Sequence, residues 1–264
     1  MIPGQPRLEI RELTVAFGAR VVSDISHLAI APGEIVGLAG ESGSGKSMTA
    51  TAILGLGRTA GASVSGSVAL NGRELIGLPE RELRHVRGRQ IAMIFQSPVG
   101  SFNPVFKVGD VFERALRLHG ASKRAAREQA ASALEEVLLS PNLLDRFPHQ
   151  LSGGQAQRVA IALALALRSE VLLADEPTSA LDVTVQAEIL DLLRSVRKES
   201  NMSVLFISHD LAVIAELCDR IAVMQRGKIV ETGPARRVLT QPSDPYTREL
   251  VASVPRLGTG MVAG

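Results

Sequence analysis

A glycine-rich segment has the residue types and spacing of a phosphate-binding loop. Residues 40–47 read Gly-Glu-Ser-Gly-Ser-Gly-Lys-Ser, after an apolar run from Ile35 to Ala39 and before a helix-compatible run from Ser47 to Leu54. Glycines let successive backbone N–H groups point into one concavity, and a helix start adds positive potential. In the pattern G-x-x-x-x-G-K-[ST], the lysine reaches the β- and γ-phosphates and the hydroxyl binds Mg²⁺. We expect a nucleoside triphosphate site rather than an ordinary glycine turn, formed by Gly40, Glu41, Ser42, Gly43, Ser44, Gly45, Lys46, Ser47 and Met48.

A second glycine motif lies far downstream. Leu151-Ser-Gly-Gly-Gln155 precedes a strongly apolar stretch, Ala156 to Leu167, with the composition of a buried helix. The N–H groups at a helix start, together with a serine hydroxyl, form an anion-binding device. A turn with a helix cap is the simpler interpretation of two glycines alone, but the phosphate loop upstream favours a second phosphate contact. Its residues are Ser152, Gly153, Gly154 and Gln155.

Two adjacent carboxylates follow a third apolar run. Val171 to Ala174 has the character of a buried strand, and Asp175 and Glu176 come directly after it. Ligands bind at the carboxyl ends of strands in open α/β sheets. Asp175 is therefore a candidate Mg²⁺ ligand, and Glu176 a candidate base for the attacking water. Solvated surface acids are the alternative, which the apolar strand and the phosphate loop disfavour.

The elements that position these motifs alternate between strands and helices. Strands are expected at 35–39, 91–95, 171–174 and 204–207, with helices between them, which indicates a parallel sheet in an α/β fold. The first residues, from Leu8 to Phe17, and the Asn71-Gly72 turn signal indicate an antiparallel β-subdomain. Residues 97–150 have helical spacing at 108–118 and 122–139, with Pro141 ending the second helix. This region is expected to be a helical insert.

Composition excludes several classes. The 264 residues are 45% hydrophobic with a net charge of +2, and they include one Tyr and no Trp. A net charge this small indicates no basic patch for binding the phosphates of nucleic acid, and so few large aromatic residues provide no surface on which bases could stack. No apolar run reaches the ~20 residues of a membrane span. Residues 1–6 lack the pattern of a secretory signal, so we expect a cytosolic location. Cys218, the one cysteine, excludes an internal disulfide and is expected to be a buried core residue.

The ordered motifs resemble the ATP-binding subunit of ABC transporters over nearly the whole chain. Beyond the segments above, the resemblance rests on Gln96, the stretch Ser179-Ala-Leu-Asp182, and His209. It implies a phosphate-loop NTPase core of residues 1–96 and 151–240 with an N-terminal antiparallel β-subdomain. It also implies a helical subdomain at 97–150 and a tail at 241–264, all within one ABC ATPase domain.

The resemblance also implies roles for individual residues. Gln96 would contact Mg²⁺ and the attacking water, and His209 would contact the γ-phosphate. Ser152 to Gln155 would cover a nucleotide held by a second subunit, and Asp182 would connect the two sites. An aromatic residue should stack on the adenine, and Phe17 is the candidate, with a core position as the alternative. ATP and Mg²⁺ are the implied cofactors.

Two segments narrow the subfamily. Phe95 to Phe106 and Pro242 to Arg256 resemble the peptide and nickel importers, although Asp244 stands where that pattern commonly has His. The brevity of the chain favours the nickel or metal-chelate type slightly, and import of dipeptides or oligopeptides stays as the alternative cargo. Part of Pro98–Asp110 is expected to dock on a membrane subunit, with internal packing of Val105 and Phe106 as the alternative.

The implied machine is a peripheral ATPase on the cytoplasmic face of the inner (plasma) membrane. Its partners would be transmembrane permeases, a related second ATPase subunit in a heterodimer, and an extracytoplasmic substrate-binding protein. ATP would close the dimer and hydrolysis would open it. The alternatives are an exporter ATPase and a soluble ABC ATPase acting on nucleic acid or ribosomes. The coiled-coil insertion or duplicated core of the latter is not found in this sequence.

Overall fold

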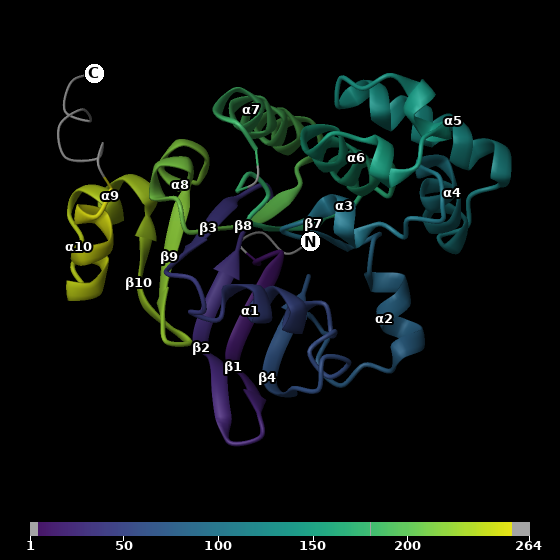
Figure 1. Ribbon diagram of the computed structural model, residues 1–264. Coiled ribbons are helices and arrows are strands. Elements are labelled where there is room, and N and C mark those ends of the chain that lie inside the picture. The colour runs from purple at the N-terminus through teal and green to yellow at the C-terminus, as the bar shows by residue number, and fades with distance from the viewer. Residues whose placement is uncertain (1–4, 180, 255–264) are drawn as a thin grey trace. The chain divides into compact units, whose positions relative to one another are not determined.

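The computed structural model describes residues 5–179 and 181–254. Contacts divide the chain into two compact units, and each is described separately. The first unit combines Met1–Pro79 with Ser203–Gly264, and the second unit is Glu80–Met202. Figure 1 labels the helices of both units and most of their strands.

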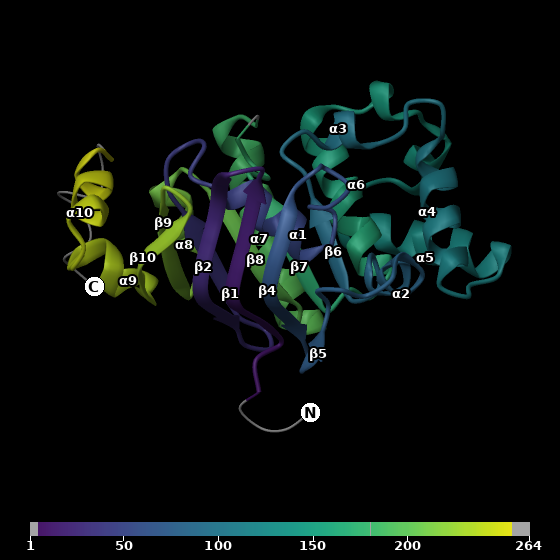
Figure 2. The same cartoon turned by 90° about the horizontal axis from the view of Figure 1, so that it is seen from below.

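An antiparallel sheet opens the first unit and confirms the expected β-rich start. Its strand order is β2-β1-β4-β5, and Figure 2 shows β2, β1 and β4 side by side. Asn71 and Gly72, with φ of 50° and 80°, form the two-residue turn between the last two strands. Both central residues of such a hairpin turn need positive φ, which explains the Asn-Gly pair. The strands are β1 (Leu8–Phe17), β2 (Arg20–Ile30), β4 (Ser63–Leu70) and β5 (Arg73–Glu74).

A second group of strands in the first unit surrounds β3. The central strand β3 pairs in parallel with β8 and β9, and β10 is antiparallel to β9. Every residue of β3 and β8 is buried, as expected of parallel strands covered on both faces. The strands are β3 (Ile35–Ala39), β8 (Ser203–Ser208), β9 (Arg220–Gln225) and β10 (Lys228–Pro234).

Four helices complete the part of the first unit that the structure describes. Helix α8 packs on β3 and β8, α9 packs on β9 and β10, and α10 packs on β10. Cys218 caps the end of α8 and is 8% exposed, so its expected place in the core is confirmed. The helices are α1 (Lys46–Ile53), α8 (Leu211–Leu217), α9 (Ala235–Thr240) and α10 (Pro245–Ala252).

The second unit combines helices with one parallel strand pair. Strands β6 (Ile91–Ile94) and β7 (Val171–Asp175) pair from Ile91↔Val171 to Ile94↔Ala174. Residues 95–170, all described, contain helices and no strand. The helices are α2 (Glu80–Val86), α3 (Pro98–Ser101), α4 (Val108–Leu118), α5 (Lys123–Glu136), α6 (Gly153–Ala166) and α7 (Val183–Ser200), with 3-10 turns η1 (Pro141–Asp145) and η2 (Pro148–Gln150).

Helices α4, α5 and α6 pack on one another in the second unit (Figure 1). The predicted bounds of α4 are confirmed, but α5 ends at Glu136, so Pro141 does not end it. Leu138 has φ of 60° and is 82% exposed, and the N–H of Leu139 bonds back to the carbonyl of Leu134. A left-handed residue closes the helix end before the proline is reached.

Candidate nucleotide-binding site

The glycine segment folds as a tight loop between β3 and α1. Gly40, Gly43 and Gly45 have φ of 148°, 79° and 108°, a region that side chains rarely adopt. A Cβ at Gly40 would lie 2.2 Å from the carbonyl oxygen of Met224, and one at Gly45 would lie 2.2 Å from that of Val22. Backbone geometry and close packing therefore both require glycine at these two positions.

The lysine of the loop is folded back on the loop's own start. Lys46 is 5% exposed, and its Nζ donates to the carbonyl oxygens of Gly40 at 2.7 Å and Glu41 at 2.8 Å. A longer contact of 3.4 Å reaches Ser44 Oγ. Ser47 is exposed in the first turn of α1, where backbone N–H groups have no partner within the helix. The loop thus holds a fixed ammonium beside a helix start, as a phosphate site requires.

Two buried hydroxyls brace this loop, and sequence patterns did not identify them. Ser23 Oγ of β2 lies 2.9 Å from Thr49 Oγ1 of α1, and both residues are fully buried. Thr49 Oγ1 also donates to the carbonyl of Gly45 at 3.0 Å. The N–H of Gly227 donates to the carbonyl of Ser44 at 2.9 Å. The loop is therefore tied to β2 through Ser23 and Thr49, and to the turn between β9 and β10 through Gly227.

His209 lies at the same sheet edge as the loop. The register of β3 and β8 pairs Ala39 with Ser208, so Gly40 and His209 each directly follow a paired strand end. His209 is exposed there, and the next residue, Asp210, caps α8 through the N–H groups of Ala212 and Val213. This geometry allows a contact from His209 to a ligand on the loop.

Phe17 is the last residue of β1, and the residue is 37% exposed. The alternative of a core position for this ring is therefore wrong. An exposed aromatic face is what stacking on a base requires. The adenine-stacking role remains a prediction.

In the second unit, the neighbouring ends of β6 and β7 bring Gln96 to Glu176. Gln96 Nε2 donates to Glu176 Oε2 at 2.8 Å, although the residues are 80 positions apart. Asp175, the last residue of β7, is 5% exposed, and Glu176 has a left-handed φ of 47°. Because the amide nitrogen faces Glu176, the amide oxygen of Gln96 is left for another ligand. A carboxylate hydrogen-bonded to an amide is a pair of groups that can orient a water molecule.

The second glycine motif forms the start of α6, three residues earlier than the apolar pattern suggested. Ser152 is the N-cap: its Oγ accepts from the N–H of Gln155 at 3.2 Å, while Gln155 Oε1 accepts from the N–H of Ser152 at 3.0 Å. This reciprocal capping box leaves the N–H groups of Gly153 and Gly154 without partners within the helix. These donors are placed to bind an anion at the helix start.

The start of α7 packs beside this helix start. Asp182 caps α7 by accepting from the N–H of Val185 at 3.0 Å, and a Cβ at Gly154 would lie 2.6 Å from Val185 Cγ1. Deeper in the helices, Arg158 joins them by an ion pair of 2.5 Å with Glu188 and also donates to the carbonyl of Val137. Arg158 is 9% exposed. This ion pair, which no sequence motif predicted, holds the two motif-bearing helices together.

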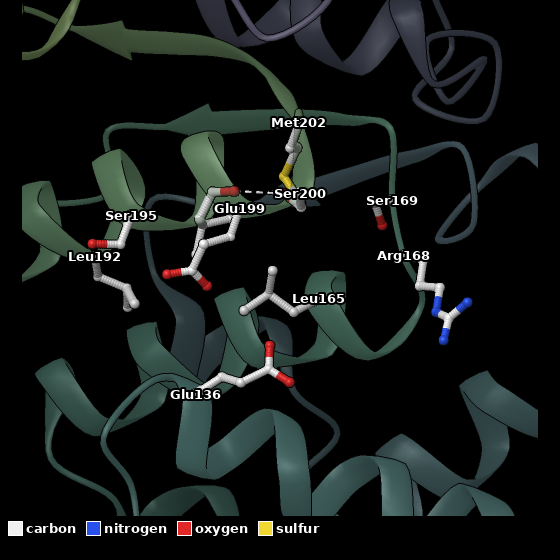
Figure 3. A pocket seen from close by; sticks show the side chains of 10 residues that line it. Glu136, Leu165, Arg168, Ser169, Leu192, Ser195, Glu199, Ser200 and Met202 are labelled. Carbon is white, nitrogen blue, oxygen red and sulfur yellow. Dashed lines mark hydrogen bonds between the residues drawn. The ribbon is translucent and has the colours of Figure 1, made fainter.

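A cavity of about 400 Å³ in the second unit is separate from these motifs. Figure 3 shows Glu136, Arg168 and Glu199 around it, with Leu165 of α6 and Met202 in its lining. Leu165 lies near the carboxyl end of α6, roughly 18 Å of helix from Gly153. None of the predicted site residues lines this cavity.

The predicted metal ligands fit Mg²⁺ in their chemistry. Ser47, Gln96 and Asp175 offer a hydroxyl, an amide oxygen and a carboxylate, and Mg²⁺ prefers oxygen donors. Ser47 belongs to the first unit, and the other two belong to the second unit. Among the described residues, no helix is long and apolar enough to cross a membrane.

A glycine loop between a buried strand and a helix, together with an acidic strand end, defines a phosphate-loop ATPase of α/β fold. The ABC transporter family matches residues 23–179, and the chain belongs to this family. The predicted fold, with its parallel sheet, antiparallel N-terminal sheet and helical insert, is confirmed, as is the activity of an ATPase in transport.

Curated relatives resemble nearly the whole chain. A putative peptide import ATP-binding protein of Brucella abortus is 45% identical over 96% of this chain and 78% of its own length. The oligopeptide transport ATP-binding protein OppD of Salmonella typhimurium is 45% identical over 97% of this chain and 78% of its own length. The glutathione import ATP-binding protein GsiA of Escherichia coli is 46% identical over 95% of this chain but only 42% of its own length.

Solved structures show the same fold. A dimeric ATP-binding cassette in a post-hydrolysis state, bound to ADP and Pi, has a TM-score of 0.76 and 30% identity. The match covers 87% of this chain and 99% of that structure. The structure of cbiO1 from Clostridium perfringens, part of the ABC transporter complex cbiONQ, has a TM-score of 0.77 and 25% identity over 96% of this chain and 97% of its own.

Proposed function

We propose that this chain is the ATPase subunit that powers a peptide importer. The observation that carries the proposal is the 45–46% identity, over nearly the whole chain, to relatives named for peptide, oligopeptide and glutathione import. These names favour the peptide class over the nickel or metal-chelate class that the tail segment also resembles. The exporter and nucleic-acid alternatives have no comparable support.

The proposed chemistry divides between the two strand-end sites. In the first unit, Lys46 and the start of α1 hold the phosphates and stabilise the charge that develops during transfer. In the second unit, Glu176 accepts a proton from the attacking water or orients it, and Gln96 holds that carboxylate in place. Ser47, Gln96 and Asp175 would hold Mg²⁺, which when bound neutralises phosphate charge.

The exposed helix start of α6 supports a dimeric mechanism. Ser152 to Gln155 of one subunit would cover the γ-phosphate on the loop of the other, with His209 contacting that phosphate and Asp182 linking the sites. Nucleotide shared by two surfaces stabilises the closed dimer, and hydrolysis removes the shared contacts. The partner is proposed to be a related second ATPase subunit.

The membrane partners follow from the importer proposal. Transmembrane permeases would hold this chain on the cytoplasmic face of the inner membrane, and an extracytoplasmic binding protein would deliver the peptide. Val105 is 69% exposed, so the alternative that it packs internally is wrong, while Phe106 lies under Arg114 with 3.7 Å between the guanidinium carbon and the ring centre. We place the permease contact on Pro98–Asp110. Val105→Asp should weaken copurification with the permease, whereas Leu138→Asp, at an apolar residue that is also exposed, should not.

The functional test is uptake of labelled dipeptide and of labelled nickel, free or chelated, in cells that carry the wild type or Glu176→Gln. The substitution should preserve ATP binding and slow hydrolysis by about 10²–10⁴-fold, the range for a general base. Dipeptide uptake should fall and nickel uptake should not. Glu199→Gln, at an exposed acid of α7, is the matched control and should transport normally.

Three results would contradict the proposal. Rapid ATP hydrolysis by Glu176→Gln would remove the catalytic role assigned to that carboxylate. Loss of nickel uptake alone would move the cargo to the metal class. Unchanged uptake of every labelled compound would place the function outside peptide and nickel import.

A further inference from the structure

The tail segment that follows β10 is anchored by a chain of backbone contacts. Glu231 of β10 accepts from the N–H groups of Ser243 at 2.8 Å and Asp244 at 3.0 Å. Asp244 then caps α10 by accepting from the N–H groups of Tyr246 at 2.8 Å and Thr247 at 3.3 Å. Pro245 occupies the first helical turn, where its missing N–H has no cost. These contacts fix the direction in which α10 leaves the sheet.

The anchored helix presents Tyr246 to the phosphate loop. Tyr246 is 8% exposed, and its hydroxyl oxygen accepts a hydrogen bond of 3.1 Å from the N–H of Glu41. The two residues are 205 positions apart and belong to the same unit. A tyrosine is amphipathic, so its ring can pack while its hydroxyl meets a backbone donor. The contact therefore joins the tail to the start of the loop.

One peptide group is held on both sides by this arrangement. The N–H of Glu41 and the carbonyl of Gly40 belong to the same planar peptide and point in opposite directions. Tyr246 takes the N–H side, while Lys46 Nζ donates to the carbonyl side at 2.7 Å. Lys46 Nζ also donates to the next carbonyl, that of Glu41. Hydrogen bonds in such a series polarise and strengthen one another.

We propose that Tyr246 is a positioning residue for ATP binding. Its hydroxyl fixes the plane of the Gly40–Glu41 peptide, and this plane orients the Gly40 carbonyl, one of the two carbonyls that hold the Lys46 ammonium beside the phosphate-binding N–H groups. The tail is then part of the nucleotide site, although it touches no phosphate. This inference rests on the proposed role of Gly40–Ser47 as the ATP site.

The test compares single-hydroxyl deletions in the full-length chain. Tyr246→Phe removes the hydroxyl that accepts the hydrogen bond and keeps the ring. The control is Thr247→Val, which removes the hydroxyl of the next residue. Thr247 is 1% exposed, and within the described residues its hydroxyl has no hydrogen bond to the loop. MgATP binding is measured by calorimetry. The Kd of Tyr246→Phe should rise about fivefold, or about 1 kcal/mol, the usual net effect of one neutral hydrogen bond. The Kd of Thr247→Val should match the wild type.

A second readout reports the bond itself. Amide hydrogen exchange at Glu41 should be slower than at the exposed loop residue Ser42 in the wild type. It should accelerate in Tyr246→Phe and stay slow in Thr247→Val. If a variant unfolded α10, amide exchange would accelerate along the whole helix and the melting temperature would fall. Tyr246→Phe keeps the packed ring and should cause neither change.

The outcomes separate the two proposals. An unchanged Kd for Tyr246→Phe, or a wild-type Glu41 amide that exchanges as fast as Ser42, would overturn the positioning role. An equal loss of affinity in Thr247→Val would also overturn it, because the effect would then belong to the helix and not to the hydroxyl. Lys46→Ala serves as the control for the site. If that variant bound MgATP as tightly as the wild type, the proposed ATP site itself would be wrong.

Discussion

The two adjacent glycines at the start of α6 should respond in opposite ways to the same substitution. A Cβ at Gly154 would lie 2.6 Å from Val185 Cγ1, whereas one at Gly153 would lie 3.5 Å from Leu181 Cδ2. Carbon atoms pack best at about 3.5–4.0 Å, so Gly153→Ala makes an ordinary contact and Gly154→Ala overlaps by roughly 1 Å. Val185 is β-branched on a helix and has one favoured rotamer, so it cannot turn aside.

The size of the effect follows from overpacking. Forcing a methyl group into such a contact costs about 1–3 kcal/mol, and 1 kcal/mol shifts the melting temperature of a chain of this size by about 2–4 °C. Gly154→Ala should therefore melt about 2–12 °C below the wild type in calorimetry. Gly153→Ala should melt at or above the wild-type temperature, because alanine stabilises a helix over glycine by up to ~1 kcal/mol.

A third variant isolates the contact. Val185→Ala removes Cγ1 and leaves Cβ, which lies 3.9 Å from the added methyl carbon. In the Gly154→Ala background it should restore most of the lost melting temperature, although it lowers stability by itself. A melting temperature of Gly154→Ala equal to that of the wild type would contradict the predicted overlap. A double variant that shows only the sum of the two single losses would contradict it as well.

Three further outcomes follow from other sites. Gly45→Ala should abolish MgATP binding in calorimetry, because φ of 108° and the Val22 carbonyl exclude a side chain; wild-type affinity would contradict this. Burial lowers the pKa of His119 below 6.5, although the ring also bonds to the Arg87 carbonyl. The unfolded chain then binds the proton more readily, so the free energy of unfolding should fall as the pH drops below about 6.5. His119→Gln should make the free energy of unfolding depend less on pH in this range. Burial raises the pKa of the Cys218 thiol, which should resist thiol reagents until urea unfolds the chain.

Local sequence patterns predicted the elements with strong periodicity or a defined loop chemistry. Strand β3 and helix α4 have the predicted bounds, because a continuous apolar run and a helical repeat are each complete within one segment. The Asn71-Gly72 turn was predicted for the same reason, since its residues alone supply the positive φ. Strands β2, β9 and β10 were not predicted: β2 and β10 mix polar and apolar residues, and the apolar run of β9 extends only over residues 221–224.

The end of α5 and the contacts within the site could not be predicted locally. The apolar residues after Glu136 continue a helical repeat, yet Leu138 adopts a left-handed backbone and is exposed. The bond from Gln96 to Glu176 joins residues 80 positions apart, and the bond from Glu41 to Tyr246 joins residues 205 positions apart. The apolar strand before it identified Glu176 as a site residue, and the family resemblance identified Gln96, but no pattern in the sequence specifies which atoms meet.

The left-handed backbone of Glu176 has a consequence for engineering this protein. A φ of 47° costs a residue with a side chain about 1–2 kcal/mol, whereas glycine adopts it freely and asparagine adopts it more readily than most residues. Random mutagenesis that selects only for heat resistance would therefore enrich glycine and asparagine here and remove the carboxylate proposed as the base. Selection for thermostable variants should therefore also require ATP hydrolysis, because thermal stability and catalysis favour different side chains at this residue.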